Sequence, residues 1–497
     1  MSREEKNICG FCGEEVKVSK LVPVNDGTGI KDMCPRCRKH YKIETKEDIY
    51  EEIAQKIVAP IDFVELLDRK VKGQDQAKKA LAVAVHSHYT RVCNSEYLKE
   101  MDKPFEKSNI IMTGPSGTGK TLLAKTMAEL LDVPFVIANS TSLSETGYVG
   151  NDVESILTRL LKAADMNVKR AECGIVFIDE IDKKAIKGEN TSITRDVSGE
   201  GVQSALLKMI EGCQIGVPKN EGRIHPHEQL IEMDTSNILF ICGGAFVGIE
   251  DIVRKRLNIP KKNGARIGFA NSNNIQLSED DMTKFLRKKV NHRDLEKFGM
   301  IKEFLGRLPI VCNLEPLTRE DIMEILHSKY GIIEEYKTYF ELQRKSIEFT
   351  DEALDMLADG AVDKGFGARG LRGILAGSLR DIMFYAPSED KEHYVIGKED
   401  LQDYLYEYYM EYTNAVMAIE SFETEHKKLN KLFYFTDEVK KYMAREVYEN
   451  NIEISELKKI LADLYHEFEL GTFLEEETLS LMLVSRYFED TQRRKAA

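Results

Sequence analysis

The sequence has no run of about 18 apolar residues, which is roughly the length a helix needs to cross a bilayer. Its first ten residues, MSREEKNICG, contain no apolar stretch of the kind that forms the core of a secretion signal. These two absences predict a protein of the cytoplasm or an equivalent reducing compartment. The chain also lacks a basic excess, because its formal net charge is −14. That charge disfavours general affinity for the phosphate backbone of nucleic acids.

Cysteine is unevenly placed in the chain. Four of the nine cysteines form two CxxC pairs near the N-terminus, separated by 21 residues (Cys9 and Cys12, Cys34 and Cys37). In a reducing compartment, two such pairs indicate a tetrahedral site of four thiolates, with Zn²⁺ as the expected ion. A segment of about 40 residues is too short for an adequate core, so the metal would supply folding free energy, on the order of 10 kcal/mol.

Two other readings of the cysteine pairs stay open. One is a redox dithiol, and the other is a zinc ribbon that binds nucleic acid. The basic cluster at residues 36–40 is too small to form a nucleic-acid-binding face.

The length of 497 residues, with 42% hydrophobic and 31% charged residues, predicts a globular protein of two to four domains. Between about Ile61 and Pro309, short apolar runs alternate with amphipathic helical stretches. The runs are NIIMTG, CGIVFIDEID and NILFICGG. This alternation is typical of an α/β fold, a parallel sheet with helices on both faces.

Beyond Pro316 the pattern becomes helical, and two segments open on a threonine suited to cap a helix, Thr318 and Thr350. The last hundred or so residues are acidic, rich in tyrosine and helical in pattern, and they contain no proline.

The strongest motif is GPSGTGKT, which follows the apolar run Ile110–Met112. Its glycines let backbone N–H groups wrap a phosphate chain at the start of a helix. Lys120 would contact the β- and γ-phosphates, and the Thr121 hydroxyl would bind Mg²⁺. The predicted ATP-binding residues of this loop are Gly114, Pro115, Ser116, Gly117, Thr118, Gly119, Lys120, Thr121 and Leu122.

The segment IVFIDEID supplies the complementary half of an ATPase site about 60 residues later. Four apolar residues form a buried strand that ends on Asp179 and Glu180. Asp179 would hold the Mg²⁺ shell, and Glu180 would polarise the attacking water. The alternative is an acidic helix cap after a strand.

Several independent motifs together resemble the ClpX family, the AAA+ unfoldases that deliver substrates to the ClpP peptidase. The resemblance extends from Cys9 to about residue 398. Besides the two ATPase motifs it rests on VKGQDQAKKALAVAVHSHY (71–89), GYVG (147–150), SITRDVSGEGVQSALLKMIEG (192–212), ILFICGGAF (238–246), EFLGRLP (303–309) and GARGLRGIL (367–375). It implies a large AAA+ ATPase domain followed by a small, mostly helical domain.

The resemblance assigns further residues to the nucleotide. Val71 and Lys72 would border the adenine. Arg307 would be an arginine finger inserted into the ATP site of the neighbouring subunit, and Arg369 would sense the γ-phosphate. Lys72 stands where the family usually has a branched apolar residue. The run ILFICGG offers no polar side chain for the position known as sensor 1.

The resemblance also assigns residues to protein partners. Tyr148 and Val149 would form the first pore loop, which grips the substrate polypeptide, and residues 184–196 the second. Ile267, Gly268 and Phe269 would dock on a ClpP-type peptidase. The pore-entrance motif, at residues 223–225, has Ile224 where the family has a cation.

The sequence therefore predicts a zinc-binding module at residues 1–45, a linker at 46–60, an AAA+ large α/β domain at 61–316, a small domain at 317–398 and an acidic helical extension at 399–497. The expected cofactors are ATP, Mg²⁺ and Zn²⁺. The expected assembly is a homohexamer, because a finger supplied in trans needs a neighbour and a head-to-tail contact closes into a ring.

The expected function is ATP-driven unfolding of protein substrates, with possible adaptors, and their delivery to the peptidase, without a nucleic-acid or membrane partner. The alternatives are a remodelling chaperone that acts without a peptidase and an AAA+ motor that acts on nucleic acid.

Overall fold

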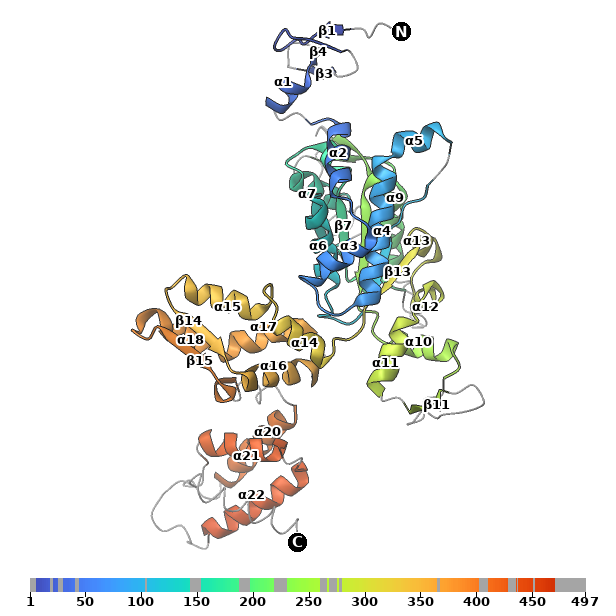
Figure 1. Cartoon of the computed structure of the whole chain (residues 1–497). Helices are drawn as coiled ribbons and strands as arrows, with labels where there is room; N and C mark the ends of the chain where they lie inside the picture. Colours follow the sequence, from blue (N-terminus) through green and yellow to red (C-terminus); the bar gives the residue numbers. More distant parts are fainter. Residues whose placement is uncertain are drawn as a thin grey trace. The chain divides into compact units, whose positions relative to one another are not determined.

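The computed structural model describes residues 6–17, 21–25, 30–40, 44–102, 105–143, 153–186, 197–218, 230–259, 266–267, 275–276, 279–363, 367–401, 410–427, 435, 437–449 and 452–469 (Figure 1). The chain divides into two compact units, each described by itself below. One comprises Met1–Tyr330 with Phe366–Ala368, and the other Gly331–Gly365 with Arg369–Ala497. Among the helices of these residues, none combines the length and the hydrophobicity needed to cross a membrane.

The first unit is built on a sheet of five parallel strands. Their order across the sheet is β13 (Ile310–Asn313), β5 (Ile110–Thr113), β10 (Leu239–Gly244), β7 (Ile175–Asp179) and β6 (Phe135–Asn139). All residues of β5 and β10, and the first four of β7, are buried. Strands that are buried on both faces have continuous runs of apolar residues in their sequence. The three predicted runs are β5, β7 and β10, which confirms the α/β fold class.

Helices cover both faces of this sheet, and alternate strand residues supply the two cores. One core joins Ile110, Phe177 and Ile241 to α3 (Pro60–Asp68), α4 (Asp75–Cys93) and α6 (Lys120–Leu131). The other joins Ile111 and Ile178 to the helices α7 (Ser155–Ala163), α9 (Val197–Glu211), α10 (Ile249–Arg256), α11 (Glu279–Lys288), α12 (His292–Phe298) and α13 (Lys302–Gly306).

Shorter elements connect these helices and strands. They are the helices α5 (Ser95–Glu100) and α8 (Val168–Ala171), the 3₁₀ turns η2 (Ser140–Ser142), η3 (Ile181–Lys184) and η4 (Thr235–Asn237), and the antiparallel pairs β8 (Gln214–Val217) with β9 (Ile231–Asp234) and β11 (Arg266–Ile267) with β12 (Ile275–Gln276).

The N-terminal part of this unit consists of two antiparallel strand pairs and a short helix. The elements are β1 (Lys6–Ile8) with β2 (Glu15–Lys17), β3 (Val22–Asn25) with β4 (Ile30–Met33), and α1 (Pro35–His40). Among the residues of this part whose burial is described, the buried core consists of Met33 and three cysteines. So small a core agrees with a module that depends on a metal for its stability.

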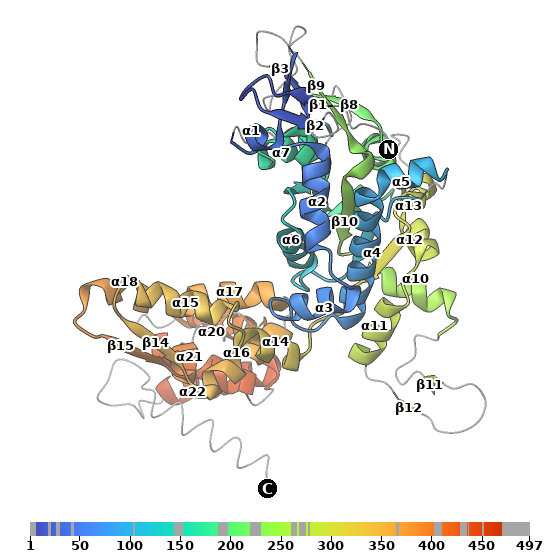
Figure 2. The same cartoon turned by 45° about the horizontal axis from the view of Figure 1, so that its top comes forward.

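Helix α2 (Lys46–Lys56) lies in the predicted linker and packs on the ATPase core, against α4, α6 and α8 (Figure 2). Its apolar residues Ile49 and Ile53 are buried in the core that includes α4 and α6. The helix begins at a capping box, in which Thr45 and Asp48 bond to each other's backbone N–H.

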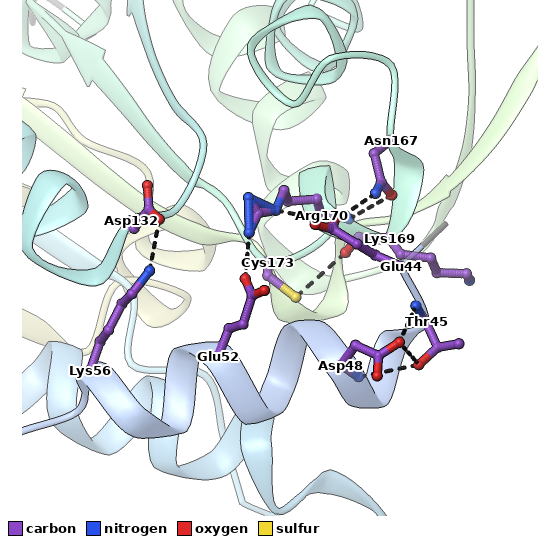
Figure 3. A network of polar contacts seen from close by, with 10 residues as sticks. All are labelled: Glu44, Thr45, Asp48, Glu52, Lys56, Asp132, Asn167, Lys169, Arg170 and Cys173. Atoms are coloured by element: carbon purple, nitrogen blue, oxygen red, sulfur yellow. Dashed lines mark hydrogen bonds and ion pairs between the residues drawn. The ribbon is translucent and has the colours of Figure 1, made fainter. Parts of the chain in front are cut away.

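Charged side chains also hold α2 against the ATPase core (Figure 3). The Arg170 guanidinium of α8 donates to Glu52 at 2.6 Å and lies 3.4 Å from Glu44. At the far end of α2, Lys56 donates to Asp132 at 2.7 Å. The hydrogen bond to Glu52 raises the pKa of Arg170. The helix is thus held by both apolar burial and ion pairs.

The remaining elements follow the predicted change to helix. In the first unit they are α14 (Arg319–Leu326) and the first two residues of α17 (Gly367–Ser378). In the second unit they are the rest of α17, α15 (Ile332–Glu341), α16 (Asp351–Asp363), α18 (Arg380–Tyr385), the turn η5 (Ala386–Ser388) and the parallel strands β14 (Ser346–Phe349) and β15 (His393–Ile396). The predicted caps are present: Thr318 accepts from the Asp321 N–H, and Thr350 from the Ala353 N–H at 3.3 Å.

In the part of the extension that the structure describes there are three helices, α20 (Met410–Lys427), α21 (Asp437–Glu449) and α22 (Ile454–Glu469). They enclose a core of their own, with Ile419, Met443, Leu457 and Leu461 almost fully buried. Lys440 pairs with the buried Glu423 at 2.7 Å. The acidic tail thus forms a packed helical bundle over these residues.

We predict that Arg170→Gln weakens the attachment of α2 to the core, because the change removes a cation that lies close to both Glu44 and Glu52. Partly exposed pairs contribute about 0.2–1 kcal/mol each, so amide exchange in α2 should quicken by several-fold while the core helices are unchanged. Lys169→Gln is the matched control, since Lys169 pairs with the neighbouring Glu172. Equal exchange rates in α2 for both variants would contradict the assignment.

Candidate functional site

The phosphate-binding loop lies between β5 and α6, where its sequence predicts it. The strand ends at Thr113, and the helix begins at Lys120. Gly117 and Gly119 adopt left-handed backbone conformations, with φ of 77° and 95°. Residues with a side chain rarely adopt these angles, so the loop depends on glycine at both positions. The loop and the first turn of α6 place backbone N–H groups where a phosphate binds.

Lys120 and Thr121 lie at the start of α6 and face the loop and strand β7. The buried Lys120 ammonium donates to the carbonyls of Gly114 at 2.6 Å and Pro115 at 2.8 Å. The Thr121 hydroxyl donates to Asp179 Oδ2 at 3.4 Å. The structure thus brings the two predicted ligands of Mg²⁺ together, although 58 residues separate them in the chain.

The acidic pair lies at the end of β7. Asp179 Oδ1 accepts the Glu180 N–H at 2.8 Å, and Glu180 adopts a left-handed conformation with φ of 58°. A residue other than glycine in this region is strained, and such strain gathers at functional sites. Ser140, which is buried after β6, donates to the Glu180 carbonyl at 2.7 Å. Sequence reasoning missed Ser140, because a serine after a strand carries no signal of its own.

Two predicted nucleotide contacts lie beside the loop. Val71 is buried, and its Cγ1 lies 3.8 Å from the position a Cβ of Gly119 would occupy. The Lys72 ammonium donates to the Asp68 carbonyl at 2.9 Å. Ala368, which belongs to the same unit, donates its N–H to the Gly117 carbonyl at 3.3 Å. The predicted sensor Arg369 is the next residue along the chain.

Arg307 lies at the other end of the sheet. It follows α13 just before β13, and its carbonyl accepts from Asn109, the residue before β5. Since β5 and β13 are parallel, Arg307 is at the amino end of β5, whereas the phosphate loop follows the carboxyl end. Its guanidinium pairs with Glu211 at 2.9 Å, and both side chains are about half exposed. The geometry separates Arg307 from the phosphate loop of its own subunit.

Some predicted residues lie outside the described part of the chain. They are Tyr148 and Val149 of the first pore loop, residues 187–196 of the second, the pore-entrance residues 223–225, and Gly268 and Phe269 of the docking tripeptide. Ile267 is described only as part of the strand pair β11–β12.

The four N-terminal cysteines form one cluster. The sulfur atoms of Cys9, Cys12, Cys34 and Cys37 all lie within 4.8 Å of one another, and those of Cys12 and Cys34 are 3.6 Å apart. A tetrahedral zinc site with Zn–S bonds of about 2.3 Å requires sulfur separations of about 3.8 Å. The Cys34 N–H donates to the Cys9 sulfur at 3.2 Å, and such bonds orient ligands of a metal. The donor set and its spacing therefore fit Zn²⁺.

Two domain families match the ATPase part of the chain. The family described as the AAA domain (Cdc48 subfamily) matches residues 105–311, which include both ATPase motifs. The family described as the C-terminal, D2-small domain of ClpB protein matches residues 317–395.

Curated relatives match four-fifths of the chain. One is the ATP-dependent Clp protease ATP-binding subunit ClpX of Treponema denticola, which is 45% identical over 395 residues, or 79% of this chain and 93% of the relative. The protein of the same name from Porphyromonas gingivalis is 43% identical over 406 residues, or 80% of this chain and 95% of the relative. The chain therefore belongs to the ClpX family of ATP-dependent Clp unfoldases, and it is an AAA+ ATPase.

Proposed function

We propose that this chain forms a homohexameric ring that unfolds protein substrates with the energy of ATP hydrolysis and feeds them to a ClpP-type peptidase. The observation that carries the proposal is the division of the catalytic groups between the two ends of the sheet. Lys120, Thr121, Asp179 and Glu180 gather at the carboxyl end of the parallel strands, and Arg307 lies at the amino end. An arginine placed there completes the site of a neighbouring subunit, and repetition of that contact closes a ring.

Within one subunit, the described side chains divide the work of hydrolysis. Lys120 contributes the positive charge beside the phosphates, and the backbone N–H groups of the loop hold them in place. Thr121 and Asp179 are the oxygen ligands that would hold Mg²⁺, which neutralises phosphate charge when bound. Glu180 accepts the proton of the attacking water. Arg307 of the neighbour stabilises charge in the transition state, an effect of about 10³–10⁵ in rate.

The remaining predicted residues couple hydrolysis to movement of a polypeptide. Arg369 would report the state of the γ-phosphate from the small domain. Tyr148 and Val149 would grip the substrate in the pore, because an amphipathic aromatic ring contacts varied sequences. Ile267, Gly268 and Phe269 would bind the peptidase, which would cover their apolar side chains. Tagged or unfolded proteins and their adaptors are the expected substrates and partners.

A remodelling chaperone that acts without a peptidase is the second candidate function. The apolar tripeptide 267–269 argues against it, because a free-standing remodeller would have no partner to cover those side chains. The relatives are also named as subunits of a protease.

We predict that Glu180→Gln keeps nucleotide binding and ring assembly but lowers ATP turnover by about 10²-fold or more, because the variant cannot accept a proton. Steady-state hydrolysis and binding of a fluorescent nucleotide measure the two effects separately. Glu129→Gln is the control. Glu129 is an exposed residue of α6 that forms an ion pair with Lys70. Turnover of Glu180→Gln within a few-fold of the unaltered protein would refute the assignment of the base.

We predict that replacing both Cys9 and Cys12 by serine releases zinc and unfolds roughly the first 45 residues. Without four thiolates, the small core of this module is insufficient. ATPase activity should persist, because α2 and the sheet retain their own cores. Metal analysis checks the prediction. One equivalent of zinc bound to the double variant would contradict a four-cysteine site.

We predict that Phe269→Ala uncouples unfolding from degradation. A buried aromatic anchor typically contributes about 2 kcal/mol or more, and the loss is repeated across the subunits of a ring that share one partner. ATPase activity and unfolding without peptidase should stay normal, while degradation with ClpP falls. Asn273→Ala, in the same segment, is the control. Unchanged degradation would favour the remodelling chaperone, and joint loss of ATPase activity and thermal stability would indicate a structural role.

A further inference from the structure

Asp182 is a buried acidic residue next to the catalytic pair, and the scheme above gives it no role. It lies in the turn η3, two residues after Glu180, and is 9% exposed. Its Oδ2 accepts the N–H of Phe246 at 3.1 Å, across 64 residues of sequence. Among the residues that the structure describes, its Oδ1 has no hydrogen-bond partner. Burying a carboxyl group with one bond is costly, so the position calls for an explanation.

Phe246, the partner of Asp182, has an unusual conformation. It follows β10, its side chain is fully buried, and its φ is 47°. A bulky residue rarely adopts this left-handed conformation without support from its surroundings. The hydrogen bond from its N–H to Asp182 is such a support. Asp182 therefore holds the loop after β10 in a strained form.

Gly244 links this contact to the phosphate loop. It is the last residue of β10, and its carbonyl accepts the N–H of Gly114, the first residue of the loop, at 3.2 Å. A Cβ at Gly244 would lie 2.6 Å from the Phe246 ring and 2.8 Å from Asp182 Oδ1. At distances this short, a side chain at position 244 would force the Phe246 ring or the Asp182 carboxylate to shift. Asp182, Phe246 and Gly244 thus form a continuous contact from the turn that carries Glu180 to the start of the phosphate loop.

A second anchor holds the same loop independently. The buried Arg287 of α11 donates to the Ala245 carbonyl at 2.7 Å and pairs with Glu250 at the start of α10. The loop should therefore stay folded without Asp182, although its position relative to Glu180 would be less well fixed.

We propose that Asp182 is a positioning residue for ATP hydrolysis. It fixes the position of the loop after β10 relative to the catalytic Glu180. Through Gly244, it also fixes the position of the start of the phosphate loop. Its carboxylate extends from the turn that follows β7 to the loop that follows the apolar end of β10, Cys242-Gly243-Gly244. The proposal rests on the ATPase assignment and not on the peptidase partnership.

The test compares Asp182→Ala with Asp182→Asn in the full-length protein. Alanine removes the acceptor of the Phe246 N–H, whereas an asparagine amide oxygen can replace it. We expect alanine to lower kcat for ATP tenfold or more, a change of about 1.4 kcal/mol in the barrier. The Kd for a fluorescent ATP analogue should stay within about threefold. Asparagine should restore kcat to within about threefold of the unaltered protein.

Glu172→Ala is the matched control. Glu172 is likewise a buried carboxyl group that accepts a backbone N–H, from Asp234 at 3.0 Å, but it precedes β7, at the opposite end of that strand. The Glu172→Ala substitution should lower the melting temperature of the protein and leave kcat for ATP near normal. Were Asp182→Ala not to fold, Gly244→Ala would test the same contact. Its methyl group would displace the Phe246 ring and the Asp182 carboxylate, while the carboxylate itself stays in the protein.

A normal kcat in Asp182→Ala or in Gly244→Ala would overturn the proposal, as would a loss of nucleotide affinity in Asp182→Ala as large as its loss of kcat. So would an Asp182→Asn variant as slow as Asp182→Ala, or a loss of kcat in Glu172→Ala equal to that in Asp182→Ala. Failure of peptidase coupling would bear only on the proposed function, because each of these measurements uses ATP alone.

Discussion

Strands β5, β10 and β7 lie side by side in the sheet, hydrogen-bonded in parallel, and the catalytic site depends on that pairing. Since the three strands run in the same direction, their carboxyl ends meet at one edge. The phosphate loop follows β5, the acidic pair ends β7, and Gly244 ends β10. The contact between Thr121 and Asp179 exists because this register brings the two strand ends to the same level. A change of strand order would separate the phosphate loop from the acidic pair Asp179–Glu180.

The same parallel arrangement places Arg307 far from the phosphate loop of its own chain. Arg307 lies before β13, at the amino end of the sheet, and pairs there with Glu211. An exposed pair of this kind contributes about 0–1 kcal/mol, so little free energy is lost when the arginine takes a phosphate partner instead. Its placement suits a residue that acts on a neighbouring subunit, and this is why the proposed function requires a ring.

Different forces stabilise the segments joined to the ATPase core. The N-terminal module has four clustered sulfur atoms and, over its described residues, a small apolar core, so a bound metal would be its main source of stability. Helix α2 combines buried Ile49 and Ile53 with the ion pairs around Arg170. Helices α20–α22 have an apolar core of their own. Chelation, salt and core substitutions should therefore affect the three segments separately.

The sequence by itself determined the features that adjacent residues encode. Continuous apolar runs specify β5, β7 and β10, because strands buried on both faces need apolar residues at every position. The phosphate loop and the CxxC pairs can be predicted from the sequence because each is defined by the spacing of residues close together in the chain. Only the tertiary structure decided the strand order, the Ser140 bond to Glu180, the docking of α2, the end of the sheet that carries Arg307, and the Asp182 contact with Phe246. These depend on pairing between residues far apart in the chain, and no periodicity in the sequence records which distant segments become neighbours.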